Sequence, residues 1–185
     1  MALVIAGMTI SLDGFVADRE GSAGPLYPDL AALRTTPYMQ ALIEETGSVL
    51  MGRWTFEMGD PDGYVDEYEF QVPIFVVTHE PPTLMPKQNE RLTFTFVTDG
   101  VESAVEQSRA AAGDKAVQVV GGPRLINELL RAGLVDELRV DIMPVMLGTG
   151  LRLFDDRDLD RTQLEKIGVE EAGPRTTLRF RVSPG

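Results

Sequence analysis

Two strand-to-helix junctions in the sequence carry residue types that hold phosphate groups. In "VVGGPRLINELL", residues 119–130, an apolar run enters a helical pattern through Gly121, Gly122 and Pro123. The glycines remove side chains where a flat or phosphorylated ligand must approach the backbone, and the proline presets the first helical turn. The amino end of a helix also offers unpaired N–H groups to an anion. A tight turn without a ligand is the alternative, and these residues alone leave both interpretations open.

The second junction, "SVLMGRWTFE", places Gly52 after another apolar run and Arg53, Trp54 and Thr55 in the turn that follows. An arginine offers a planar fork of donors suited to phosphate, and a threonine hydroxyl can hold another phosphate oxygen. The alternative is an exposed arginine and a helix cap at Thr55. A dinucleotide carries a pyrophosphate and, as NADP, a further phosphate. Two anion-holding turns in one small chain therefore favour a dinucleotide site.

Strands and helices alternate along the chain and would position these junctions. Apolar and β-branched runs predict strands over residues 3–10, 48–51, 72–78, 93–98, 115–120, 138–145 and 177–182. Helical spacing predicts helices over residues 38–45 and 103–112 and from residue 123 onward. This order predicts a three-layer α/β fold with a mixed, mostly parallel central sheet and an antiparallel C-terminal edge. With 185 residues and no linker or repeat, we expect one domain, residues 1–185.

Composition excludes several classes of function. The chain has 29 acidic against 17 basic residues, and its net charge of −12 argues against nucleic acid and anionic membrane surfaces as partners. It has no cysteine and one histidine, His79, so we expect no thiolate nucleophile and no metal site. The apolar N-terminus lacks a basic region and is interrupted by Asp13, which indicates a buried strand rather than a membrane span. A cytoplasmic location is the default expectation.

Four segments resemble a known family in their order and spacing. They are "TISLDGFVAD", "LMGRWTFE", "PIFVVTHE" and "VVGGPRLINELLRAGLVDELRVDIMPVMLGTGLRLF". Together they resemble the dihydrofolate-reductase-like superfamily, and most closely the C-terminal reductase domain of the bifunctional riboflavin-biosynthesis deaminase-reductase. The resemblance covers about residues 3–154. It implies a dihydrofolate-reductase-like fold and NADPH as the cofactor.

The resemblance also implies roles for individual residues, position by position. The first junction would cover the pyrophosphate and nicotinamide, the second would bind phosphates, the segment after the next strand would line the adenosine side, and the first strand would flank the nicotinamide. The Ser11–Asp13–Gly14 turn would shape the mouth of the pocket. The cofactor-binding residues implied in this way are Ala6, Gly52, Arg53, Thr55, Thr78, His79, Gly121, Gly122, Pro123, Arg124 and Leu125.

Two acids are candidates for the catalytic group. The riboflavin enzymes follow the cofactor turn with Asp-Asp-Pro, and here Gly59-Asp60-Pro61 stands at that spacing, so one Asp is kept. Dihydrofolate reductases carry their substrate carboxylate in the segment resembling "LYPDLAALRTT", which nominates Asp29. An ordinary loop Asp beside a proline is the alternative for both. The ribose-phosphate grip of the riboflavin enzymes is missing, and only Arg34 and Tyr27 lie nearby.

The expected function is an NADPH-dependent reductase of a small heterocyclic substrate, resembling 5-amino-6-(5-phosphoribosylamino)uracil reductase of riboflavin biosynthesis. The alternatives are a dihydrofolate or pterin reductase, favoured if Asp29 lies in the pocket, an NADPH-binding module without turnover, and a purely structural interaction protein. We also expect a homodimer, because residues 140–147 are apolar at nearly every position and would need cover from a second copy.

Overall fold

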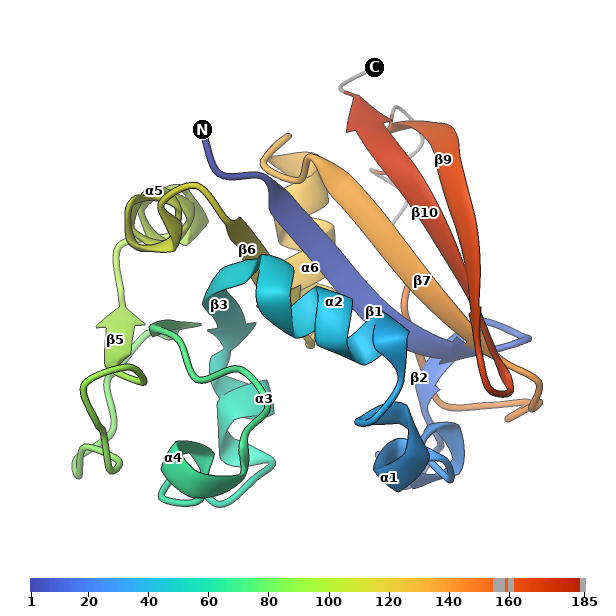
Figure 1. The fold of residues 1–185 in the computed structure, drawn as a ribbon, viewed down its shortest axis with the longest axis horizontal. Helices are drawn as coiled ribbons and strands as arrows, with labels where there is room; N and C mark the ends of the chain where they lie inside the picture. Colours follow the sequence, from blue (N-terminus) through green and yellow to red (C-terminus); the bar gives the residue numbers. More distant parts are fainter. Residues whose placement is uncertain (155–158, 160–161, 184–185) are drawn as a thin grey trace.

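The fold is built on one long mixed sheet. The computed structural model describes residues 1–154, 159 and 162–183. Its eight-stranded sheet has the order β5-β4-β3-β6-β1-β7-β10-β9, and Figure 1 shows it running across the molecule. The parallel strands are β1 (Val4–Ser11), β3 (Thr46–Gly52), β4 (Ile74–Val77), β5 (Phe94–Val97), β6 (Ala116–Val120) and β7 (Glu137–Met143). The antiparallel strands at one edge are β9 (Gln163–Ala172) and β10 (Arg175–Ser183). Two short strands, β2 (Phe15–Ala17) and β8 (Leu151–Arg152), pair separately.

Helices cover both faces of this sheet. One face is covered by α5 (Val101–Ala112) and α6 (Pro123–Arg131), and α2 (Pro37–Glu45) crosses the other (Figure 1). The Thr36 hydroxyl accepts the Met39 N–H and Pro37 follows the cap, so the sequence starts α2 at this point. Shorter helical turns are η1 (Gly24–Leu26), α1 (Leu30–Leu33), α3 (Arg53–Glu57) and α4 (Tyr64–Glu67). The expected three-layer α/β fold with a mostly parallel sheet is confirmed.

The two faces of the sheet differ in polarity. Toward α5 and α6 the strands present a continuous apolar core that includes Val4, Val117, Val119, Leu138 and Val140. Toward α2 a second apolar cluster fills only the part over β3, β4 and β5. Successive side chains of a strand point to opposite faces, so the neighbours of these apolar residues point toward α2. On β6, β1, β7 and β10 several of those neighbours are polar, among them Gln118, Thr9, Arg139, Asp141 and Thr177.

A fully buried arginine ties the antiparallel edge to the rest of the fold. The Arg175 side chain has no exposed surface, and it donates to both carboxylate oxygens of Asp29 at 2.9 and 2.7 Å. It also donates to the Thr9 hydroxyl and to the Leu26 carbonyl, both at 2.9 Å. The guanidinium lies 5.0 Å from the centre of the Tyr27 ring. Strand β10, strand β1 and the segment before α1 are therefore held by one side chain.

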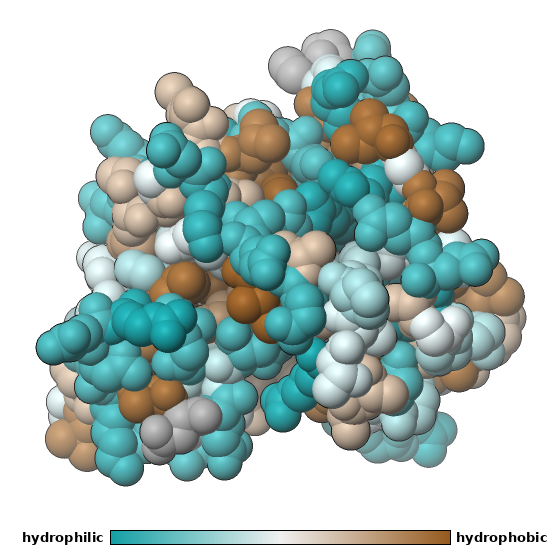
Figure 2. Space-filling view, viewed as in Figure 1, coloured by the Kyte–Doolittle hydropathy of each residue, from teal (hydrophilic) through white to brown (hydrophobic). Residues whose placement is uncertain are grey.

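The predicted C-terminal pairing is confirmed, but its surroundings differ from the expectation. Strand β7 pairs with β10 in antiparallel fashion, yet it lies inside the sheet between β1 and β10. Val140 and Met143 are 6% and 2% exposed, so part of the apolar run on which the homodimer was expected is covered within the chain, whereas Met146 in the same run is 68% exposed. Exposed apolar side chains also lie on the edge strand β9, where Leu164 and Val169 are 47% and 52% exposed, and Figure 2 shows apolar patches on this hairpin. The homodimer itself stays a prediction.

Strand β9 was not predicted, because its sequence "QLEKIGVEEA" is rich in charge and lies along an exposed edge. A strand with little burial gives a weak hydrophobic pattern. The described helices are also all too short or too polar to cross a membrane.

Replacing Asp29 with Asn should destabilise the fold. Asn keeps the shape but leaves the buried Arg175 charge without its carboxylate, and breaking such a pair costs about 3 kcal/mol in the free energy of unfolding. The melting temperature should fall by about 6–12 °C. The exposed Asp99→Asn is the matched control and should melt as the unmodified chain does. Equal melting of the Asp29 variant would contradict the role given to this pair.

The same pair predicts a pH dependence. The hydrogen bonds from Arg175 lower the pKa of Asp29 below its ordinary value of 3.8. A lowered pKa gives stability that is complete above the ordinary value and is lost as the pH falls through the folded value. The difference in unfolding free energy between the unmodified chain and Asp29→Asn should therefore be constant at neutral pH and shrink below about pH 4.

Candidate functional site

The two glycine junctions meet at the carboxyl ends of neighbouring parallel strands. Strands β3 and β6 pair in parallel with Leu50 opposite Val119, so the chain leaves both strands at the same edge of the sheet. A Cβ placed on Gly121 would lie 2.9 Å from Cγ2 and 3.1 Å from Oγ1 of Thr55. Gly121 and Gly122 also have φ angles of 68° and 72°, which favour glycine. The first junction needs glycine at position 121 because Thr55 of the second junction occupies the space that a side chain would take.

The second junction is joined to the segment after β4. The Arg53 guanidinium donates to the Glu80 carbonyl at 3.1 Å, and the Thr78 hydroxyl donates to the same oxygen at 2.7 Å. Arg53 also pairs with Glu57 at 2.7 Å, while 47% of its side chain remains exposed. His79 is exposed in this segment. The residues expected on the adenosine side of a dinucleotide thus lie together at one rim of the sheet.

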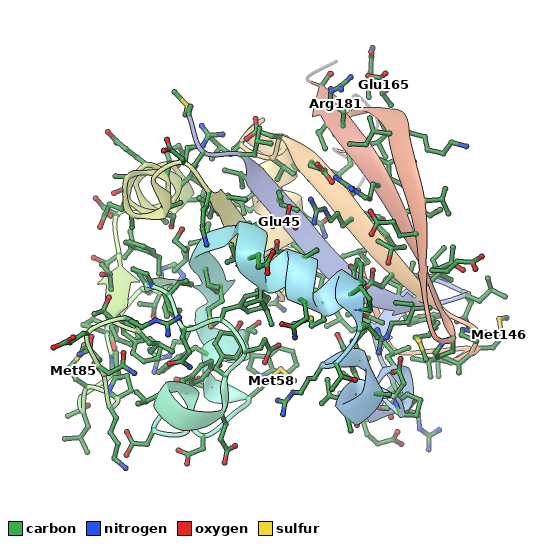
Figure 3. All side chains as sticks on the ribbon, in the orientation of Figure 1. Glu45, Met58, Met85, Met146, Glu165 and Arg181 are labelled. Carbon is green, nitrogen blue, oxygen red and sulfur yellow. The ribbon has the colours of Figure 1, made fainter. Side chains whose placement is uncertain are left out.

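A cavity of about 300 Å³ opens beside these junctions. Its floor comes from β1, β6 and β7, including Gly7 and Asp141, and α2 and the segment before it form one wall. Thr55, Trp54 and Met58 form the opposite wall. Figure 2 shows the surface hollowed between the part that carries α3 and α4 and the part that carries α1, and in Figure 3 Met58 lies in this gap. The cavity has the size and the concave shape of a small-ligand site.

The turn that follows β1, which was expected to shape the mouth of the pocket, lies outside the cavity lining and binds the loop after β7. Asp13 accepts the Ser11 hydroxyl at 2.6 Å and the main-chain N–H groups of Leu147 and Gly148 at 3.1 and 2.7 Å. These bonds, the one from Ser11 most strongly, lower the pKa of Asp13 to about 2. The turn thereby fixes the loop after β7 against β2, which contributes Val16 and Ala17 to the lining.

The expected cofactor residues fall into three groups. Thr55, Gly121, Gly122 and Pro123 line the cavity. The side chains of Ala6 and Leu125 belong to the apolar core on the opposite face, so only the main chain beside Ala6 faces the site. The remaining residues lie along the junctions outside the cavity lining, and they are Gly52, Arg53, Thr78, His79 and the exposed Arg124.

Neither acid expected from the sequence lines the cavity. Asp60 is exposed in a turn, where its Oδ1 accepts the Asp62 N–H at 3.1 Å and its carbonyl accepts the Gly63 N–H at 3.0 Å. Asp29 stands at the start of α1 without capping it, because its carboxylate binds Arg175. The structure therefore gives Asp60 a turn-forming contact and Asp29 a structural one.

Two other acids line the cavity, and sequence reasoning missed both. Oδ1 of Asp141 accepts the Thr177 hydroxyl at 2.6 Å and the Tyr38 hydroxyl at 3.1 Å, and burial raises the pKa of this carboxyl. Glu69 lies 3.9 Å from the Arg34 guanidinium. The available signal for Asp141 was a carboxylate between the apolar residues Val140 and Ile142 of a predicted strand, because an acid is rarely buried without a partner.

Comparison with known proteins identifies the family. The sequence pattern of the RibD C-terminal domain family matches residues 2–178. The chain belongs to the RibD C-terminal domain family. The resemblance expected from the motifs is thereby confirmed, and because this domain is a reductase domain, the match supports a reductase-like role.

Individual relatives agree with this family. The chain is 25% identical over 173 residues to the uncharacterized protein YwjB of Bacillus subtilis (strain 168), covering 94% of each chain. The crystal structure of a putative riboflavin biosynthesis protein from Shewanella sp. PV-4 superposes with a TM-score of 0.76 at 22% identity, covering 99% of both chains. The Saccharomyces cerevisiae riboflavin biosynthesis reductase Rib7 superposes with a TM-score of 0.63 at 16% identity, covering 98% of this chain and 90% of Rib7. These likenesses show that the fold is that of the RibD reductase domains.

Two alanine variants should separate backbone strain from crowding at the first junction. Gly121 and Gly133 have similar φ angles, 68° and 66°, but only Gly121 has Thr55 beside the position of a Cβ. Alanine at either position incurs the left-handed backbone cost of about 1–2 kcal/mol. Gly121→Ala should also displace Thr55 and lower the melting temperature further than Gly133→Ala. Thermal unfolding of both variants checks this. An equal fall in melting temperature for the two variants would show that a side chain at position 121 does not clash with Thr55.

Proposed function

We propose that the chain is an NADPH-dependent reductase of a small heterocyclic substrate. The observation that carries the proposal is the contact between the two junctions, Gly121 against Thr55, at the carboxyl ends of adjacent parallel strands and beside a cavity. Ligands of open α/β sheets bind at such ends. Membership of a reductase-domain family supports the same reaction class.

The residues at the junctions fit NADPH. Gly121 and Gly122 are partly exposed and line the cavity at the start of α6, whose cap has no side-chain hydrogen bond, so main-chain N–H groups can hold the pyrophosphate. Arg53 lies beside Thr78 at the rim, where an exchange of its Glu57 pair for a 2′-phosphate would hold the adenosine end. The main chain of Ala6 and Gly7 would flank the nicotinamide. When bound, NADPH supplies a hydride from nicotinamide C4.

We assign the donation of the proton to the carboxyl group of Asp141. Reduction of a C=N or C=O bond adds the hydride to carbon and a proton to nitrogen or oxygen. A carboxyl group that lines the cavity and has a raised pKa keeps its proton to higher pH than an exposed acid does. The Tyr38 and Thr177 hydroxyls donate to Oδ1 and fix the orientation of the group.

The dihydrofolate-reductase alternative gains nothing from the structure. It was favoured if Asp29 lay in the pocket, and Asp29 binds Arg175 instead. An NADPH-binding module without turnover has the same junctions, so it is separated from a reductase by a turnover measurement rather than by binding.

Cofactor binding tests the proposed function directly. Calorimetric titration should show that NADPH binds more tightly than NADH, because Arg53 pairs with the 2′-phosphate. Arg53→Ala should weaken NADPH binding about tenfold or more and leave NADH binding unchanged, since hydrogen bonds to charged groups contribute about 1.5–3 kcal/mol. The exposed Arg19→Ala is the matched control. Failure of the unmodified chain to bind either cofactor would remove the proposal.

Turnover tests the assignment of the acid. Asp141→Asn should lower the rate of NADPH oxidation at least about tenfold while cofactor binding is kept, because general acid assistance contributes about 10²–10⁴-fold. The rate of the unmodified enzyme should fall as the pH rises through the raised pKa of Asp141, and the variant should lack this decline. Asp60→Asn should turn over normally. Loss of turnover in the Asp60 variant alone would return the role to Asp60.

A further inference from the structure

A buried glutamine amide faces the cavity without its full set of hydrogen bonds. Gln118, on β6, is 4% exposed and lines the cavity floor. Its Oε1 has no hydrogen-bond partner among the described residues. A buried amide oxygen that accepts no hydrogen bond costs stability, and this one is distinguished from the other unpaired buried atoms of the described residues by lining the cavity, where a ligand can reach it.

A glycine makes room for this amide. A Cβ on Gly7 would lie 2.7 Å from Nε2 of Gln118, so only glycine at position 7 allows the amide to lie across β1. Gly7 has an ordinary backbone conformation, and its missing side chain is explained by this close approach. The chain thus keeps a polar group at a buried position and omits a side chain to accommodate it.

Each arginine that lines the described part of the cavity is already paired with a carboxylate of the protein. The two cationic side chains of the cavity in the described part of the chain are Arg34 and Arg139. Arg139 is 8% exposed and is bound by Glu45, visible on α2 in Figure 3, and by Glu137 at 2.7 Å. Arg34 faces Glu69, which also lines the cavity. Away from the junction glycines, a phosphate group of a substrate would have to compete with Glu69 for the half-exposed Arg34 or with Glu45 and Glu137 for Arg139, in a chain whose net charge is −12.

We propose that the cavity selects a planar heterocycle that donates hydrogen bonds through ring N–H groups and carries no phosphate group, and that Gln118 is the specificity-determining residue. The Oε1 acceptor requires a donor from the ligand. A carboxamide also carries donors on its other side, so it matches a ring in which N–H stands next to C=O. The inference rests on the proposed function only in taking this cavity as the substrate site.

Ligand binding can be followed without any reaction. Trp54 is the single tryptophan of the chain and lines the cavity, so its fluorescence reports occupancy. The probes are 5,6-diaminouracil and its 1,3-dimethyl derivative, which lacks the ring N–H groups. The unmodified chain should bind the first at least tenfold more tightly. Gln118→Leu should bind the first at least tenfold more weakly and should lose the discrimination between the two, whereas Gln107→Leu, the same change on the exposed side of α5, should change neither.

A second pair of probes tests the phosphate. A ribitylaminouracil should bind at least as tightly as the same compound with a terminal phosphate. Tenfold tighter binding of the phosphate form, unchanged uracil binding by Gln118→Leu, or no uracil binding by the unmodified chain would each overturn the inference. Gln118→Leu should also melt no lower than the unmodified chain, because it removes an unpaired buried group. A lower melting temperature would show that Gln118 serves the fold and would overturn the inference as well.

Measuring NADPH binding in parallel distinguishes a failure of this inference from a failure of the proposed function. Gln118→Leu should bind NADPH as the unmodified chain does. If the chain binds no NADPH but discriminates between the uracils through Gln118, the proposed reductase fails and the inferred ligand class stands. If NADPH binds and the uracils do not, the reverse holds.

Discussion

The buried ion pair between Arg175 and Asp29 is the interaction on which the cavity depends. A guanidinium without exposed surface is stable only when its charge is paired and its donors are used, and here the Asp29 carboxylate, the Thr9 hydroxyl and the Leu26 carbonyl meet that need. Because these partners belong to β1 and to the segment that enters α1, the pair fixes one wall of the cavity to the antiparallel edge of the sheet. Asp29, the acid at the start of α1, therefore stabilises the fold around the cavity.

This stabilisation matters because the sheet is polar where the cavity lies. Toward α5 and α6 the strands bury an unbroken apolar surface, which stabilises the fold. Toward α2 the second apolar cluster lies mainly over β3, β4 and β5, and beside it β6 and β7 present Gln118, Arg139 and Asp141. Polar groups at the middle of a sheet need partners, and this chain supplies them from α2 and β10 for Arg139 and Asp141. Oε1 of Gln118 is the described atom of this set that stays unpaired.

Local sequence patterns predicted most of the fold and the glycine junctions that lie beside the cavity. The parallel strands have dense runs of apolar, β-branched residues, and the junctions at Gly52 and Gly121 combine glycine with a helix start, so both were visible in the sequence. The charged edge strand β9 was not, because its sequence has no buried face to reveal it. The cavity acids were missed for a different reason. The hydrogen bonds that hold Asp141 come from Tyr38 and Thr177, which lie 103 and 36 residues away in the sequence, and only the folded chain brings the three side chains together.

The division of the sheet has a consequence for how such a protein can diverge. The junctions at β3 and β6 are set by backbone shape and by the contact between Gly121 and Thr55, which tolerate little change. The cavity floor, in contrast, is set by single side chains that alternate with core residues along β6 and β7. Exchange of one side chain that faces the cavity leaves its neighbours in the core untouched. A duplicated gene could therefore acquire a new ligand through a few point mutations while the two glycine junctions are inherited unaltered.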